Sequence, residues 1–236
     1  MLSERRRKIL NLIVREYSKK REPVGSKEFS QRFFPDLSPA TIRREFFTLT
    51  KSGFLIQSHA SAGRIPTDKA YKLFVDNVLE NEEKLVSQSE QWQKKIKDFD
   101  DNDKNIFSET AKMAADFCDG LAISYWPDHN FIFKFGLGNL FSHLPDISQS
   151  EIGQILDDIE FMDGRMEGLF DELFDMERSV FIGKESPITK SENLSVISRS
   201  LPAKEKSLIL LIGPKNMSYD KNLAILEAIA NFVHNP

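Results

Sequence analysis

Residues 38–46 read SPATIRREF and predict a short helix with one apolar side and one polar side. Ser38 is a good N-cap, and Pro39 suits the first helical position, where its missing N–H would have no partner anyway. Ile42, Phe46 and Leu49 recur at helical spacing and mark the buried side. The opposite side carries Ala40, Thr41, Arg44 and Thr48, with Arg43 and Phe47 flanking it. Such a helix suits a DNA groove, and it equally suits plain solvent.

The segments on either side of this helix predict a small N-terminal domain. Ser3 can cap a first helix, Ser26 opens a short second helix, and Gly53 is well placed to end the third. Residues 54–59 and 64–67 then read as two short strands around a turn of small residues. Three helices followed by a hairpin form the winged helix-turn-helix arrangement, in which the third helix enters the major groove.

The charge of the chain is unevenly distributed. Residues 1–76 hold 16 Lys/Arg and 8 Asp/Glu, a net +8, whereas residues 77–236 hold 16 and 28, a net −12. A basic head on an acidic body indicates a polyanion as the partner of the head. The alternative is a solvated surface on which charge happens to be uneven.

Length and composition predict a cytoplasmic protein with one or two domains. The 236 residues contain no apolar run near the roughly 18 needed to cross a membrane, so no membrane partner is expected. The single cysteine, Cys118, fits a reducing compartment and a buried core position. No metal site is expected, because the four histidines lack metal-ligand spacing, and no cofactor is expected, because GLGN at 136–139 is not a dinucleotide-binding fingerprint.

A long linker helix is predicted to begin at Thr67 or Asp68. Its apolar residues recur every seven positions, at Val78, Leu85, Trp92 and Phe99. This seam predicts either a dimerising coil of two chains or a tether packed on its own body.

The remaining residues predict an α+β domain. A helix is expected at 106–118, a helical stretch at 149–175 broken near Asp163 and Gly164, and an amphipathic helix at 223–233. Strand-like runs occupy 121–126, 131–135, 179–183, 194–199 and 207–213. Strands in two batches with helices between them indicate a largely antiparallel sheet. The predicted domains are therefore 1–76, a linker helix and acidic loop at 77–105, and 106–236.

Several motifs resemble one protein family. EPVGSK, LSPATIRREF and SGFLIQSHASAGRIPTDKAY are similar to the DNA-binding domain of the HrcA family of bacterial heat-inducible transcription repressors. The resemblance covers residues 2–76, with weaker echoes at 136–141, 181–185, 194–197 and 212–219. It implies repression of chaperone genes through an inverted-repeat operator called CIRCE, a homodimer, a GAF-like C-terminal domain and control by the GroEL chaperonin.

The sequence also departs from that family. Family members are typically longer and carry a dimerising insert roughly where residues 126–130 join two apolar runs here. Arg44 stands where the family often has Asn, and Phe47 where it usually has a small residue. Base preference and the dimer interface are therefore expected to differ.

The interpretation favoured by these patterns is a non-enzymatic DNA-binding repressor that recognises double-stranded DNA as a homodimer. The alternative is a protein-interaction or ligand-sensing module whose DNA-binding head is vestigial. The residues expected at the DNA are Ser26, Lys27, Ser38, Ala40, Thr41, Arg43, Arg44, Thr48, His59, Ser61, Gly63 and Arg64.

Overall fold

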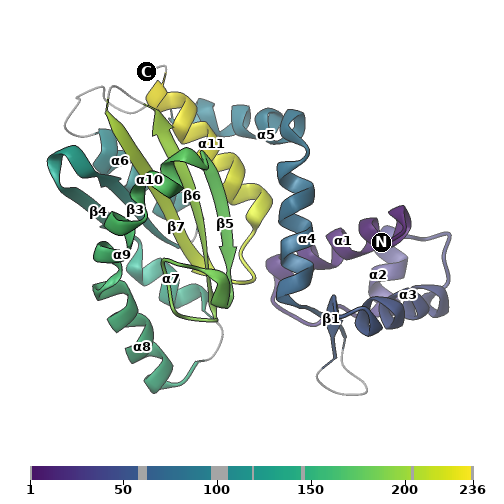
Figure 1. Ribbon diagram of the computed structural model, residues 1–236. Coiled ribbons are helices and arrows are strands. Elements are labelled where there is room, and N and C mark those ends of the chain that lie inside the picture. Colours follow the sequence, from purple (N-terminus) through teal and green to yellow (C-terminus); the bar gives the residue numbers. More distant parts are fainter. Residues whose placement is uncertain are drawn as a thin grey trace. The chain divides into compact units, whose positions relative to one another are not determined.

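The computed structural model describes residues 2–57, 63–96, 106–118, 120–144, 147–202 and 205–234 (Figure 1). The chain is a mixed α+β protein, as the sequence predicts. Its helices are α1 (Glu4–Lys20), α2 (Ser26–Phe33), α3 (Pro39–Lys51), α4 (Asp68–Leu79), α5 (Glu82–Ile96), α6 (Ile106–Cys118), α7 (Leu137–His143), α8 (Gln149–Glu160), α9 (Met162–Gly168), α10 (Phe170–Asp175) and α11 (Tyr219–His234). Its strands are β1 (Leu55–Ile56), β2 (Ile65–Pro66), β3 (Leu121–Trp126), β4 (Phe131–Phe135), β5 (Arg178–Ile182), β6 (Leu194–Pro202) and β7 (Lys206–Pro214), with short 3₁₀ turns η1 (Pro127–His129) and η2 (Gly183–Glu185).

The chain divides into two compact units. The head comprises Met1–Val78 with Asn216–Ser218, and the body comprises Leu79–Lys215 with Tyr219–Pro236. Each unit has its own buried apolar core.

The head is built from α1 to α4 and the two-stranded sheet. The apolar stripe of α1 is buried at Ile9, Leu10, Ile13 and Val14, and Ser3 caps the helix by accepting the N–H of Arg6. α2 and α3 add Phe29, Ile42, Phe46 and Leu49 to the same core, and α4 adds Ala70, Tyr71, Phe74 and Val75. β1 and β2 pair antiparallel, with Leu55 opposite Pro66.

The predicted continuous linker helix is wrong, because it is interrupted between Leu79 and Glu82. Asn81 caps the second helix: its side-chain oxygen accepts the N–H of Lys84, and its carbonyl accepts that of Leu85. An Asn side chain that satisfies an orphan N–H group in this way marks the start of a new helix. Val78 and Leu85 therefore lie on separate helices, and no single helix carries the expected seam.

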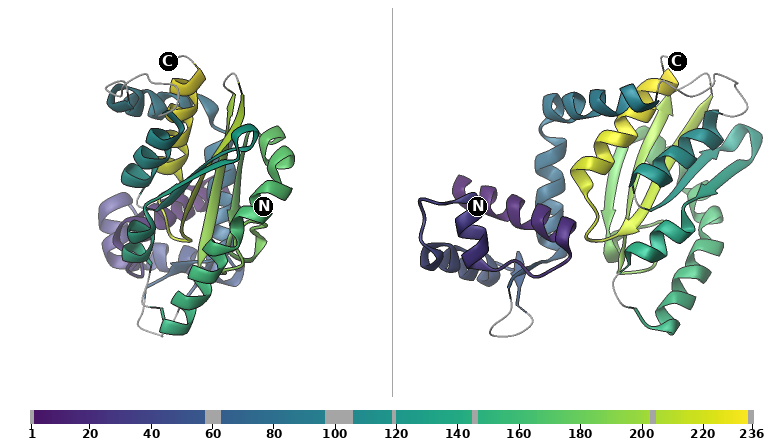
Figure 2. Two further views of the ribbon diagram at one scale, coloured as in Figure 1. Left: turned by 90° about the vertical axis from the view of Figure 1, so that its left-hand side faces the viewer. Right: turned by 180° about the vertical axis from the view of Figure 1, so that it is seen from behind.

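The body contains a five-stranded sheet in the order β4-β3-β7-β6-β5, in which every neighbouring pair is antiparallel. Helices cover both faces, with α6 and α11 on one side and α7 to α10 on the other (Figure 2). The second side holds a large apolar core that includes Ile123, Leu140, Met166 and Leu210. Cys118 at the end of α6 is buried, as expected.

Two helical predictions in the body need correction. The stretch 149–175 breaks at Phe161 and Leu169, and Asp163 and Gly164 lie inside α9. α11 is not simply amphipathic, since every residue from Asn222 to Ala230 is buried. The cause is that α11 lies between the sheet and α5, which covers its outer side (Figure 2). In the described part of the chain, no helix has the length and apolar character to cross a membrane.

Candidate nucleic-acid interface

Both ends of α3 are fixed by the signals that the sequence predicts. The Ser38 hydroxyl oxygen lies 3.1 Å from the N–H of Thr41, which it accepts, and 2.9 Å from the Thr41 hydroxyl. At the other end, Gly53 has φ +76°, its N–H donates to Thr50 O, and the N–H of Phe54 donates to Leu49 O. These two bonds form a Schellman motif, so the helix has defined limits.

The outward face of α3 carries the groups expected to meet DNA. Ala40, Arg43 and Arg44 are exposed, while Thr41 and Thr48 are half-buried. Phe47, which was not among the residues expected at the DNA, is exposed beside them. The Thr48 hydroxyl donates its hydrogen bond to Arg44 O over 3.0 Å. It can therefore still accept a hydrogen bond from a ligand but has no proton left to donate. The structure therefore brings the predicted helix residues together on one accessible face.

Glu45 is a positioning residue that the sequence analysis missed. Its side chain is 7% exposed, and it accepts hydrogen bonds from Arg5 and from Arg6 Nε. Burial alone would raise the pKa of Glu45, but the hydrogen bonds from Arg6 and Arg5 outweigh it and hold the pKa below its ordinary value. The signal was present, because position 45 falls beside Ile42 and Leu49 on the helical wheel.

Arg64, one of the residues expected at the DNA, is held by two other segments of the head. Its backbone pairs with Val24 through two hydrogen bonds of 2.9 Å. Its Nε donates to Thr50 Oγ1 over 3.1 Å, and burial lowers the pKa of the guanidinium. Arg64 thus anchors the hairpin to α3 and to the α1–α2 connection.

Gly63 is required because its backbone lies very close to a neighbouring segment. A Cβ at position 63 would lie 2.5 Å from the carbonyl carbon and oxygen of Pro23 and 2.6 Å from the carbonyl carbon of Val24. The hairpin packs so closely on this backbone that only glycine fits.

The remaining predicted residues fall into two groups. Ser26 is the first residue of α2 and half-buried, with Gly25 rather than Ser26 in the N-cap position, and Lys27 is exposed. His59 and Ser61 lie outside the described residues.

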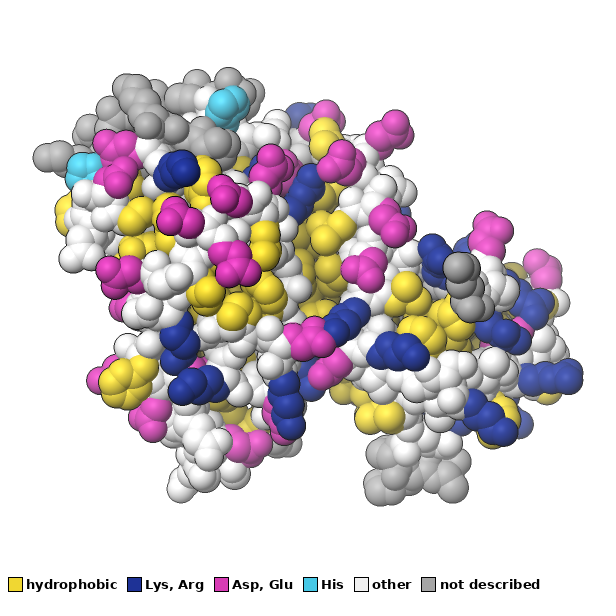
Figure 3. Space-filling view, in the orientation of Figure 1, with side chains coloured by type: hydrophobic (Ala, Val, Ile, Leu, Met, Phe, Trp, Pro, Cys, Tyr) yellow, Lys and Arg dark blue, Asp and Glu magenta, His cyan; other side chains and the backbone are white. Residues whose placement is uncertain are grey.

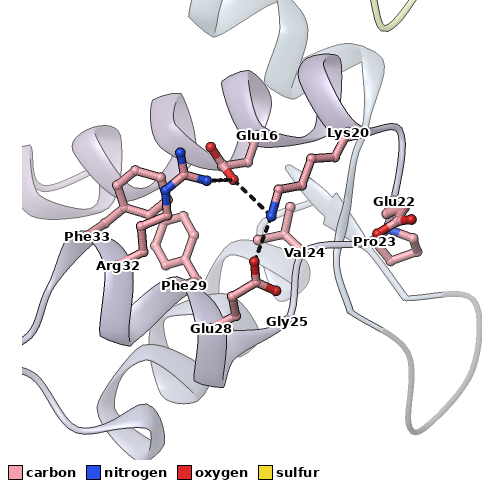
Figure 4. Close-up of a pocket in the computed structure, with 10 residues that line it drawn as sticks. All are labelled: Glu16, Lys20, Glu22, Pro23, Val24, Gly25, Glu28, Phe29, Arg32 and Phe33. Carbon is pink, nitrogen blue, oxygen red and sulfur yellow. Dashed lines mark hydrogen bonds and ion pairs between the residues drawn. The ribbon is translucent and has the colours of Figure 1, made fainter.

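A small hollow between α1 and α2 is a structural clasp (Figure 4). Arg32 Nη1 lies 2.6 Å from Glu16 Oε2, and Lys20 Nζ lies 2.6 Å from Glu28 Oε1 and 3.7 Å from Glu16 Oε2. The hollow measures about 40 Å³ and is lined by both signs of charge. That volume suits water rather than a ligand, so these charges hold α2 against α1.

Lys and Arg side chains are prominent on the visible face of the head, and Asp and Glu side chains are spread over that of the body (Figure 3). This distribution agrees with net charges of +8 and −12 in the two parts of the sequence. The head therefore has the electrostatic character of a polyanion-binding surface.

Of the residues expected to form a dimer seam, two make contacts within the body of the same chain. Leu85 is 1% exposed, and α5 packs on α11 of the same body. Trp92 is half-buried, with its ring centroid 5.4 Å from that of Phe117. Val78 is on α4, and Phe99 lies outside the described residues. The structure thus corresponds to the tether alternative, in which this helix packs on its own body.

Fold and site together define a class: an α+β chain whose small basic head presents one capped helix, joined to a larger acidic domain. A family model described as the HrcA protein C terminal domain matches residues 71–223, well over half of the chain. The chain belongs to the HrcA family.

Individual relatives agree with this assignment. The heat-inducible transcription repressor HrcA of Thermodesulfovibrio yellowstonii is 26% identical over 340 aligned positions, which cover 98% of this chain and 96% of that protein. Since the chain has 236 residues, at least 104 of those positions are occupied by the relative alone. The repressor of Alkaliphilus metalliredigens is 48% identical over 90 residues, and that of Natranaerobius thermophilus 42% over 127. These two matches span only 26% and 37% of the relatives' lengths.

One solved structure shares the fold across both units. A crystal structure described as that of a hypothetical protein aligns with a TM-score of 0.75 and covers 98% of this chain and 96% of its own. Its identity of 18% supports the fold alone.

Proposed function

We propose that this chain is a heat-inducible transcription repressor whose head is a winged helix-turn-helix that binds a CIRCE-type inverted repeat. The observation that carries the proposal is the outward face of α3, where Arg43 and Arg44 are exposed on a helix fixed at both ends. The net charge of +8 on residues 1–76 supplies the attraction to DNA. The names of the relatives support the regulatory role.

The proposed mechanism divides the contacts by chemistry. Lys27, Arg43 and the hairpin bind phosphates and fix the register, while Arg44 and Thr41 read base edges in the major groove. Arg64 acts mainly by positioning the hairpin, because its Nε is engaged by Thr50. An operator occupied in this way excludes the polymerase from an overlapping promoter and represses chaperone genes.

An inverted repeat is matched by a two-fold dimer, and we propose that this chain forms one. The dimer surface that we favour is the β3–β4 edge of the body. β4 is an edge strand that pairs with β3 alone among the described strands, and Phe131 on it is 50% exposed. Its ring centroid lies 5.9 Å from the ring centroids of both His129 and Phe133, so an aromatic cluster lies along this edge.

Two further proposals follow from the family. A GroEL-type chaperonin is the partner that maintains the activity of the repressor. The body of the chain is a GAF-like domain.

The alternative of a ligand-sensing module finds less support in the body. A hollow of about 280 Å³ lies between α8 and residues 184–193, and Glu151, Lys184, Lys190 and Glu192 contribute charged groups to its lining. Ligand pockets are usually larger and mainly apolar. Two of the charges are also paired with each other, since Lys184 Nζ lies 2.8 Å from Glu192 Oε2.

A mobility-shift titration tests the proposal. The chain is titrated on a duplex CIRCE repeat and on a scrambled duplex of the same composition, at several salt concentrations that are stated with each affinity. Binding of the CIRCE repeat at least about 10³-fold tighter than the scrambled duplex is expected for a specific regulator. Equal affinity for both duplexes would leave only non-specific binding and overturn the proposal.

A further inference from the structure

Two adjacent phenylalanines on α3 have opposite environments. Phe46 is 2% exposed and packs edge-to-face on Phe29, with centroids 5.3 Å apart. Phe47 is 53% exposed, although it belongs to the same helix. A single exposed aromatic ring needs no explanation by itself. Its neighbours on the helix decide what this ring can do.

Phe47 shares the outward face with the groups proposed to meet DNA. Ala40, Arg44 and Phe47 are spaced at i, i+4 and i+7, which places them along one side of a helix. All three are exposed. The Nζ of Lys51 lies 4.9 Å from the centroid of the Phe47 ring, so a cation contacts the ring from the next turn. A polyanion drawn to Arg44 and Lys51 meets the ring between them.

The major groove offers such a ring one apolar partner on the base edges. The C5-methyl group of thymine is that partner, whereas the other groups on the edges are hydrogen-bond donors and acceptors. We propose that Phe47 is a specificity-determining residue that packs on a thymine methyl in each operator half-site. The inference rests on the proposed function and adds an apolar readout beside the guanidinium of Arg44.

Deoxyuridine substitution tests this contact, because it removes the methyl group and nothing else. Each thymidine of one CIRCE half-site is replaced in turn, and the affinity of the full chain is measured. We expect a loss of roughly fourfold at the contacted thymidine, the value of one buried methyl group. Phe47→Ala should abolish that loss at the same position and leave the salt slope unchanged, since no charge is removed.

Two further variants complete the test. Phe47→Leu keeps an apolar group and should retain part of the sensitivity to the methyl group. Phe161→Ala, at a body residue that is 68% exposed, should behave like the unmodified chain. Because Phe47 is exposed, its replacement should leave the thermal melting of the head unchanged, which is measured alongside.

The outcomes separate the two proposals. If the chain prefers CIRCE to scrambled DNA but no thymidine is sensitive, Phe47 does not read a methyl group and the inference is overturned. The same holds if Phe47→Ala keeps the sensitivity of the unmodified chain. If CIRCE is not preferred at all, the proposed function fails, and this inference fails with it.

Discussion

Arg6 Nε donates to Glu45 Oε2 over 2.7 Å, which ties the first turn of α1 to the middle of α3. Glu45 lies on the buried side of α3, and Arg5 bonds to its other carboxylate oxygen. Together with the buried Ile42, Phe46 and Leu49, the bonds to Glu45 hold α3 in the rotation about its axis that leaves Arg44 and Phe47 facing outward.

Replacement of Glu45 by Gln should destabilise the head. The loss in the free energy of unfolding is expected to be about 1–3 kcal/mol, because two charge-assisted hydrogen bonds weaken. Arg5 and Arg6 remain partly solvated, which limits the loss. Urea unfolding followed by circular dichroism, with hydrogen exchange in α1 and α3, measures it. Glu90→Gln at an exposed position of α5 is the control and should change little.

The same carboxylate should contribute a pH dependence. Since the folded pKa of Glu45 is held below its ordinary value of 4.5, its stabilisation is complete above pH 4.5 and is lost as the pH falls through the folded pKa. Stability measured from pH 7 down to pH 3 should fall less steeply in Glu45→Gln than in the unmodified chain. Parallel profiles would show that folding does not shift the pKa of Glu45.

Replacement of Gly63 by Ala should displace the hairpin. A Cβ there would meet the Pro23 carbonyl at 2.5 Å, a distance that the rigid backbone cannot accept without moving. We expect lower thermal stability of the head and weaker CIRCE binding. Gly25→Ala is the matched control, because a Cβ at that position meets open space among the described residues. Equal melting temperatures for both variants would mean that the hairpin adjusts without cost.

Replacement of Arg44 by Ala should reduce sequence discrimination. A bidentate contact to guanine is worth about 1–3 kcal/mol on the operator and much less on random DNA. Arg43→Ala, at a proposed phosphate contact, should weaken binding to both and reduce the salt slope by about one. If Arg44→Ala lost as much affinity on random DNA as on the operator, Arg44 would be a phosphate contact instead.

Local signals in the sequence predicted more of this structure than long-range ones. Ser38 and Gly53 fix the ends of α3 through hydrogen bonds to residues within four positions, and Pro39 removes an N–H that would have no partner. Such local effects are readable from the sequence alone. Strand positions in the body were also predictable, because apolar runs between turns leave few alternatives. The seven-residue repeat misled the linker prediction, since periodicity does not register the cap formed by Asn81.

Contacts between distant segments account for most of what the sequence did not reveal. The close approach of Gly63 to Pro23 joins residues 40 positions apart, and no local pattern marks it. The bond from Arg64 to Thr50 is of the same kind. Burial of α11 on several sides depends on α5, which returns to it from more than 120 residues earlier.

The proposed dimer surface gives the last prediction. Light scattering at micromolar concentration should show roughly twice the chain mass of 27.1 kDa. Phe131→Glu should shift the mass toward one chain without lowering the melting temperature, because the ring is half exposed and a charge at a sheet edge opposes strand pairing. Leu85→Glu should instead lower the melting temperature, since it buries a charge between α5 and α11 of one body. If the dimer resists Phe131→Glu but dissociates with Trp92→Glu, while each chain stays folded, the dimer interface lies on α5 instead of on the β3–β4 edge.

Two-fold binding of DNA further requires that Phe131→Glu weaken binding to the full repeat far more than to an isolated half-site, because only the full repeat engages two heads at once.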